Sequence, residues 1–89
     1  MMNDLKDTVE LMQSNDYKDR FRAEYYQTKI RYDKLHAMIV KYEAGTLGFE
    51  PKCALSLLKE QAANMGKYLY NLEVRAQVEG IELKQKVFV

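Results

Sequence analysis

The sequence has few of the residues that break or cross-link a chain: 4 glycines, 1 proline and 1 cysteine in 89 residues. The single Cys53 excludes an internal disulfide and is typical of a protein from a reducing compartment. Apolar runs fall short of the roughly 18 residues that a membrane span requires. The start, "MMNDLKDTVELMQS", has no apolar stretch like that of a signal peptide. We therefore expect a soluble, cytoplasmic protein that does not bind membranes.

The sequence also lacks an excess of charge of either sign. It has 14 Lys+Arg against 13 Asp+Glu, which leaves a formal net charge of +1. A protein that coats DNA or RNA, or binds membranes through a polybasic segment, is usually far more positive. Direct nucleic-acid binding is therefore disfavoured, although 30% of the residues are charged and can still form local basic patches.

The positions of the few glycines predict the helices. Two of the four glycines and the only proline lie in "AGTLGFEP", residues 44–51. Residues 16–44 and 52–65 contain neither residue type. This pattern predicts a helix, a loop and a second helix, with a C-cap at Gly45, a restart at the proline and a second end at Gly80.

A weaker amphipathic element precedes the first long helix. Residues 3–13 place Leu5, Val9 and Met12 on one side of a predicted short helix. The "SND" of residues 14–16 then breaks it and supplies N-cap oxygens for the long helix.

Apolar spacing predicts how the long helices pack. The first carries a stripe at alternating steps of four and three, and the second repeats the rhythm at steps of seven. The stripes are Phe21, Tyr25, Thr28, Tyr32, Leu35, Ile39 and Tyr42, and Leu58, Met65 and Leu72. Two such coiled-coil-like helices joined by a short loop are expected to pack as an antiparallel hairpin, which is an all-α fold. Gly66, inside the second helix, predicts close packing by another segment.

A second apolar line runs along the opposite side of the first helix: Ala23, Tyr26, Ile30, Ala37 and Val40. A helix that is apolar on two sides is either central in a bundle or shared between subunits. Because the sequence contains no third long helix, we predict that this line is the interface of a homo-oligomer.

We expect three parts in the chain: a short N-terminal helical segment (1–15), a helical hairpin domain (16–81) and a C-terminal tail (82–89). The last three residues of the tail, "VFV", are compatible with a short strand or a sticky end.

Residue types that carry catalysis are scarce. His36 has no serine or second histidine near it in the sequence, and Cys53 follows Lys52 in the predicted loop without a partner. The sequence shows no Cys/His cluster with metal-ligand spacing and no glycine-rich phosphate loop. We therefore expect neither an enzyme nor a protein that uses a metal or cofactor.

Arginine and lysine alternate with tyrosine in "RFRAEYYQTKIRYDKLH", residues 20–36. Most of these cations fall on the flanks of the core stripe, where solvated coiled-coil side chains also lie. Tyr17 is different because it stands at the helix start next to Lys18 and Arg20. There, a phenol can stack on a base while amide N–H groups and cations bind a phosphate. The alternative is a tyrosine that only packs the helix start.

The two long helices together resemble a known family. The pattern consists of Asp19-Arg20, Lys34-Leu35 and Met38-Ile39 in the first helix, and of Leu57, Leu58, Gln61, Met65, Tyr68, Leu69, Leu72 and Arg75 in the second. Over residues 16–81 the chain resembles the helical-hairpin family of phage anti-defence sponges, which oppose CBASS and Thoeris immunity. The resemblance implies a hexamer that sequesters cyclic di- or trinucleotides, or cyclic ADP-ribose isomers, without degrading them.

The resemblance also leads to a hypothesis for the ligand site. We predict that Tyr17 stacks on a base, that Arg20 and Lys29 bind phosphates, and that Arg75 contributes from a neighbouring hairpin. The main alternative is a phage or prophage adaptor that engages a protein through the outer apolar line of the first helix. A hexamer in solution favours the sponge, and a monomer or dimer favours the adaptor.

Overall fold

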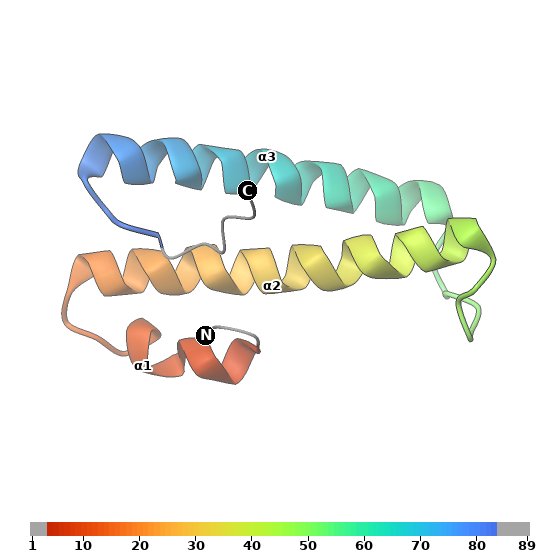
Figure 1. The fold of residues 1–89 in the computed structure, drawn as a ribbon, viewed down its shortest axis with the longest axis horizontal. Helices are drawn as coiled ribbons and strands as arrows, with labels where there is room; N and C mark the ends of the chain where they lie inside the picture. Colours follow the sequence, from red (N-terminus) through yellow and green to blue (C-terminus); the bar gives the residue numbers. More distant parts are fainter. Residues whose placement is uncertain (1–3, 84–89) are drawn as a thin grey trace, which may run out of the picture.

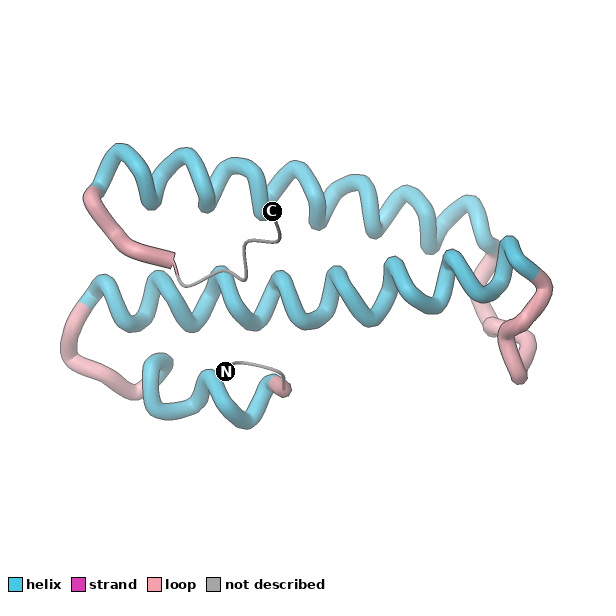
Figure 2. Tube along the Cα trace, viewed as in Figure 1, coloured by secondary structure: helices cyan, strands magenta, loops and turns pink. Residues whose placement is uncertain are grey.

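The computed structural model describes residues 4–83, and their regular structure is entirely helical (Figure 1). A 3₁₀ turn, η1 (Leu5–Thr8), leads into the short helix α1 (Val9–Met12). The long helices α2 (Tyr17–Ala44) and α3 (Leu55–Glu79) follow. Figure 2 shows helices and connecting loops and no strand in this part of the chain, which confirms the all-α class. The strand considered for "VFV" lies outside the described residues.

The ends of the long helices follow the predicted caps. The Asp16 carboxylate accepts the Lys18 backbone N–H at 3.0 Å and begins α2. Gly45 and Gly80 end α2 and α3 with φ angles of 78° and 69°, in the left-handed region where glycine is favoured. The start of the second long helix differs from the prediction. It was expected at the proline, and α3 begins four residues later, at Leu55.

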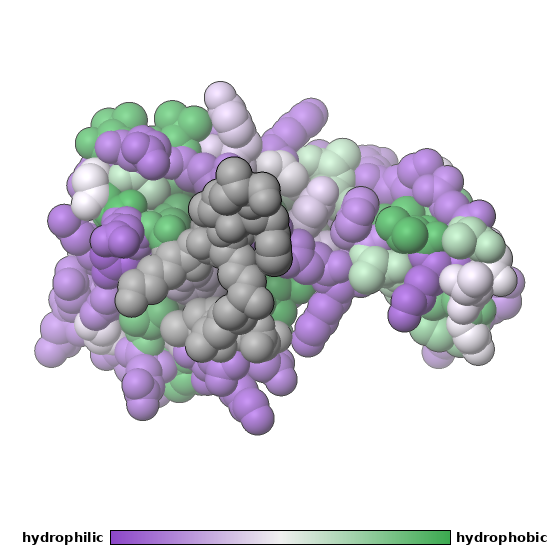
Figure 3. All heavy atoms as spheres, viewed as in Figure 1, coloured by the Kyte–Doolittle hydropathy of each residue, from purple (hydrophilic) through white to green (hydrophobic). Residues whose placement is uncertain are grey.

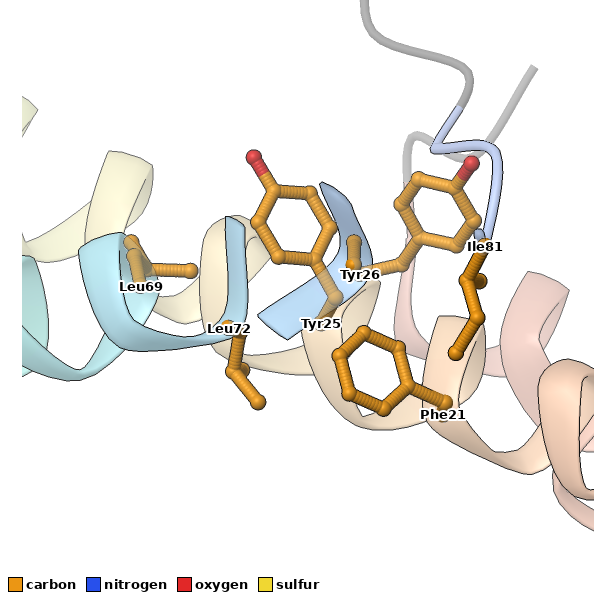
Figure 4. Close-up of a cluster of buried hydrophobic side chains, with 7 residues drawn as sticks. Phe21, Tyr25, Tyr26, Leu69, Leu72 and Ile81 are labelled. Atoms are coloured by element: carbon orange, nitrogen blue, oxygen red, sulfur yellow. The ribbon is translucent and has the colours of Figure 1, made fainter. Parts of the chain in front are cut away.

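Helices α2 and α3 lie side by side and run in opposite directions (Figure 1). Near one end, the Tyr25 hydroxyl donates to Glu73 at 2.8 Å. Near the loop between the helices, Lys59 pairs with Glu43 at 3.4 Å. The buried core lies at the end where α2 begins and α3 finishes (Figure 4). Its members are Phe21, Tyr25, Tyr26, Leu69, Leu72, Ala76 and Ile81.

The N-terminal segment packs against α2 through a different face from the predicted one. Thr8 is completely buried, and its hydroxyl accepts the Gln27 side-chain amide at 2.9 Å. Leu11 packs against the core, whereas Val9 and Met12 are exposed. The cause is the initial 3₁₀ turn, which has three residues per turn rather than 3.6 and so rotates the side chains that follow.

The outer apolar line of α2, which was predicted to be an intersubunit surface, is partly covered within one chain. Ala23, Tyr26 and Ile30 are buried, at 1%, 8% and 8% exposure. The segments before α2 and after α3 both fold back on the chain: η1 and α1 pack against α2, and Ile81 joins the core with Tyr26. They supply the third layer that no long helix provides. Of the predicted line, only Ala37 and Val40 are exposed.

Candidate functional site

Tyr17 and Arg75 meet where the first turn of α2 lies beside the last turns of α3. Arg75 Nη2 donates to the Tyr17 hydroxyl oxygen at 2.8 Å. The Tyr17 O–H in turn donates to Glu79 Oε1 at 2.9 Å, and Arg75 Nε donates to Glu79 Oε2 at 3.1 Å. The three side chains thus form a closed ring of hydrogen bonds. The Arg75 guanidinium carbon also lies 5.0 Å from the centroid of the buried Phe21 ring, in a cation–π contact.

The Glu79 carboxylate raises the pKa of both its partners in this cluster. Its hydrogen bond is the largest cause that raises the pKa of Tyr17, and it is also the largest cause that raises the pKa of Arg75. The ordinary pKa values of both groups already lie well above neutral pH, so both keep their protons there. The cluster lies at the surface, where Tyr17 is 48% exposed. A cation, a phenol donor and an accessible aromatic ring are the groups that recognise a phosphate and a base.

In a single chain, Arg75 already lies beside Tyr17. The hypothesis placed this residue on a neighbouring hairpin, but Arg75 contacts Tyr17 of its own chain. The reason is that antiparallel packing of α2 and α3 brings the beginning of one helix to the end of the other. Spacing along the sequence does not reveal this proximity of residues separated by 58 positions.

The other two predicted ligand residues lie apart from the cluster. Arg20 Nη1 donates to the backbone oxygen of Ser14 at 2.9 Å, so its exposed side chain reaches toward the segment before α2. Lys29 pairs with Asp33 at 3.0 Å. It follows Tyr17 by twelve residues, which is about 18 Å along a helix axis. One chain therefore brings Tyr17 and Arg75 together but does not bring Lys29 to them.

Sequence reasoning missed Glu79 and Arg22 at this end of the molecule, and it named Lys18 only as a neighbour of Tyr17. Lys18 Nζ donates to the Gly80 backbone oxygen at 3.4 Å, and Arg22 Nε donates to the Glu82 backbone oxygen at 2.7 Å. The sequence did contain a signal for Glu79. It follows Arg75 by four residues, a spacing at which helical side chains meet, and antiparallel pairing places both near the start of α2.

Exposed apolar side chains gather elsewhere on α3. Tyr70, Val74 and Val78 follow one another at steps of four and are 65%, 44% and 81% exposed. Figure 3 shows a mostly hydrophilic face with hydrophobic side chains over the end where α3 finishes and some near the interhelical loop. A shallow groove of about 430 Å³ lies nearer the start of α3. Its lining residues are Leu57, Glu60, Gln61, Asn64, Met65 and Tyr68.

The residues that the structure describes include neither a metal-binding group nor a membrane-spanning helix. Within residues 4–83, no three His, Cys, Asp or Glu side chains are grouped so that they could hold a metal ion. In the same range, neither long helix is apolar enough to cross a membrane. His36 stacks on Tyr32 with ring centroids 5.9 Å apart, and Cys53 is exposed in the loop before α3.

Comparison with known proteins identifies a family. A family model described as Sequestin matches residues 15–78, which include all of α2 and all of α3 except Glu79. Neither the curated proteins nor the solved structures contain a match to this chain.

Proposed function

The chain belongs to the Sequestin family, and we propose that it sequesters cyclic nucleotide immune signals without altering them. The family name indicates a binding role rather than a catalytic one. The proposed ligands are cyclic di- or trinucleotides, or cyclic ADP-ribose isomers, in the cytoplasm of an infected or lysogenic bacterium. Their capture would keep these signals from activating host antiphage defence. The single observation that supports this ligand class most is the exposed Tyr17 phenol, whose hydroxyl accepts a hydrogen bond from the Arg75 guanidinium.

Each group in this pair matches one part of a nucleotide. The exposed Tyr17 ring offers a face for stacking on a base, which is worth about 1–3 kcal/mol per base in other proteins. The planar Arg75 guanidinium suits the oxygens of a phosphate through paired charge-assisted hydrogen bonds. Arg20 begins one turn after Tyr17 on the same side of α2 and supplies a second cation when it leaves Ser14.

Lys29 enters this proposal only through a second chain. Because it lies about 18 Å along α2 from Tyr17, a neighbouring copy must bring its own Lys29 to a ligand bound at the cluster. We therefore propose a homo-oligomer, a hexamer, whose contacts include the exposed Ala37 and Val40. The exposed line of Tyr70, Val74 and Val78 on α3 provides further apolar surface for such an assembly.

Retention of ligands by purified protein tests the function. The protein at micromolar concentration is incubated with a panel of cyclic nucleotides, filtered, heated and analysed for the released compound. We expect at least one cyclic nucleotide to be depleted from the filtrate and recovered intact after heating. The variant Arg75→Gln should lose this retention, and Glu50→Gln, an exposed change in the interhelical loop, should keep it. Failure to retain any member of the panel contradicts the proposal, and recovery of hydrolysed ligand contradicts the non-enzymatic mechanism.

A second candidate is a phage or prophage adaptor that binds a protein. The groove on α3 supports it, because Leu57 and Tyr68 at this site are 56% and 39% exposed. However, the surface first predicted for such a partner is largely absent, since Ala23, Tyr26 and Ile30 are buried in their own chain. Light scattering separates the two candidates: a hexamer favours sequestration, and a monomer or plain dimer favours the adaptor.

A further inference from the structure

We propose that Glu79 is a competing anion built into the ligand site, and that it determines which anions bind there. The inference rests on the proposed function for the identity of the ligand. Glu79 engages both groups that a nucleotide would use: its Oε2 accepts Arg75 Nε at 3.1 Å and its Oε1 accepts the Tyr17 hydroxyl at 2.9 Å. A phosphate that binds this edge of Arg75 must take the place of the carboxylate. The structure therefore represents the self-paired state of the site.

The position of Glu79 is poorly explained by the stability of its own helix. It is the last residue of α3, where a carboxylate faces the negative end of the helix dipole. Its pairing with Arg75 also has the less favourable order, with the acid four residues after the base. The contacts that hold the carboxylate in place are those of the cluster, including the hydrogen bond from Tyr17 on the other helix.

The Glu79 contact is weak enough for a ligand to replace. The side chains of Arg75 and Glu79 are 50% and 33% exposed, and exposed ion pairs contribute little to stability. A phosphate forms stronger, paired hydrogen bonds with a guanidinium than a single carboxylate contact does. Release requires only that the exposed Glu79 side chain change rotamer, a motion that surface residues complete within nanoseconds.

This arrangement predicts that the site binds anions more weakly than it would without Glu79, and that it also selects among them. Because Glu79 is tethered beside Arg75, a free anion competes with a carboxylate at high effective concentration. A simple monoanion offers nothing that Glu79 does not already provide. A nucleotide adds base stacking on the exposed Tyr17 ring, which compensates for displacing the carboxylate. The site should therefore select ligands that combine a phosphate with a base.

Titration with inorganic pyrophosphate tests the role of Glu79 independently of the natural ligand. Calorimetry is run on the wild type, Glu79→Gln, the charge-matched control Glu50→Gln, and the double variant Glu79→Gln with Arg75→Gln. We expect Glu79→Gln to bind pyrophosphate about fivefold or more tightly than the wild type, since an adjacent like charge is removed. Glu50→Gln should match the wild type, and the double variant should lose the gain. Equal binding by Glu79→Gln and Glu50→Gln overturns the inference, as does a gain that survives without Arg75.

A second measurement uses the wild type, so that the inference can still be tested if a variant fails to fold. In the wild type, millimolar ADP, which combines phosphates with a base, should shift the NMR resonance of the Arg75 Nε–H as Glu79 is displaced, and an unchanged resonance overturns the inference. If Glu79 were only a structural link to Tyr17, its substitution would lower the melting temperature without changing pyrophosphate binding. Failure of the cyclic nucleotide panel alongside the expected pyrophosphate result rejects the proposed ligand but not the role of Glu79. Retention of a cyclic nucleotide without the expected pyrophosphate result rejects the role of Glu79 but does not contradict sequestration.

Discussion

Tyr25 is fully buried between the two long helices, and its hydroxyl donates a hydrogen bond to Glu73 at 2.8 Å. The phenol belongs to α2 and the carboxylate to α3, so this contact joins the two helices inside the core. Burial is the largest cause that raises the pKa of Tyr25 above its ordinary value of 10.0, and the hydrogen bond to Glu73 comes next. The fold therefore favours the neutral phenol.

This pair predicts a loss of stability at alkaline pH. Since the pKa of Tyr25 is higher in the folded than in the unfolded chain, its contribution is complete below the unfolded value of 10.0. Above that value the unfolded chain loses the proton first, and the free energy of unfolding falls by up to about 1.4 kcal/mol per pH unit. In Tyr25→Phe, this part of the fall should be absent. Urea unfolding between pH ~9 and ~11 measures both slopes, and equal slopes would contradict the assignment.

Replacing Gly66 with alanine should stabilise the chain. Gly66 lies inside α3, where alanine is favoured over glycine by about 1 kcal/mol. A Cβ at this position would lie 3.7 Å from Tyr32 Cε1, an ordinary van der Waals distance. We therefore expect Gly66→Ala to raise the free energy of unfolding by about 0.5–1 kcal/mol. Gly45→Ala is the matched control and should be destabilising, because Gly45 has a φ of 78°. Destabilisation by Gly66→Ala would indicate that another chain packs closely at this position.

Thr8 should be important for the attachment of the N-terminal segment to α2. It is fully buried, and its hydroxyl donates to the Leu5 backbone oxygen at 2.7 Å and accepts from Gln27 at 2.9 Å. Thr8→Val leaves the Gln27 amide without this acceptor and should cost about 1–2 kcal/mol. Thr28→Val is the control, because the Thr28 hydroxyl donates back to the Glu24 backbone oxygen of its own helix. Chemical denaturation compares the free energies of unfolding of the two variants. Similar small losses would mean that the N-terminal segment contributes little to stability.

Lys29 distinguishes a site within one chain from a site shared between chains. In one chain Lys29 pairs with Asp33 at 3.0 Å, about 18 Å along the helix from Tyr17. If a neighbouring copy completes the site, Lys29→Gln should weaken retention of a cyclic nucleotide about tenfold, as expected for a lost phosphate contact. Lys59→Gln, which removes an exposed lysine paired with Glu43, should have no such effect. Unchanged binding by Lys29→Gln would confine the site to the Tyr17–Arg75 cluster.

The local features of the fold were predictable from the sequence for a physical reason. Glycine tolerates the left-handed backbone that ends a helix, so Gly45 and Gly80 marked the ends of both long helices. The Asp16 cap and the buried positions Phe21 and Tyr25 likewise depend on spacing along one helix. The resemblance over the two long helices is confirmed at the level of the family.

The long-range relationships were decided only by the tertiary structure. Spacing showed that Ala23, Tyr26 and Ile30 form an apolar line, but it did not show which segment covers them. Two short segments do so within the chain, and helical periodicity is weak in pieces of that length. The contact between Arg75 and Tyr17 likewise depends on how α3 returns along α2. The sequence by itself therefore determined the helices and their apolar faces, because these follow from local spacing. Folding decided what covers each face and which charges meet, because those contacts join residues far apart in the chain.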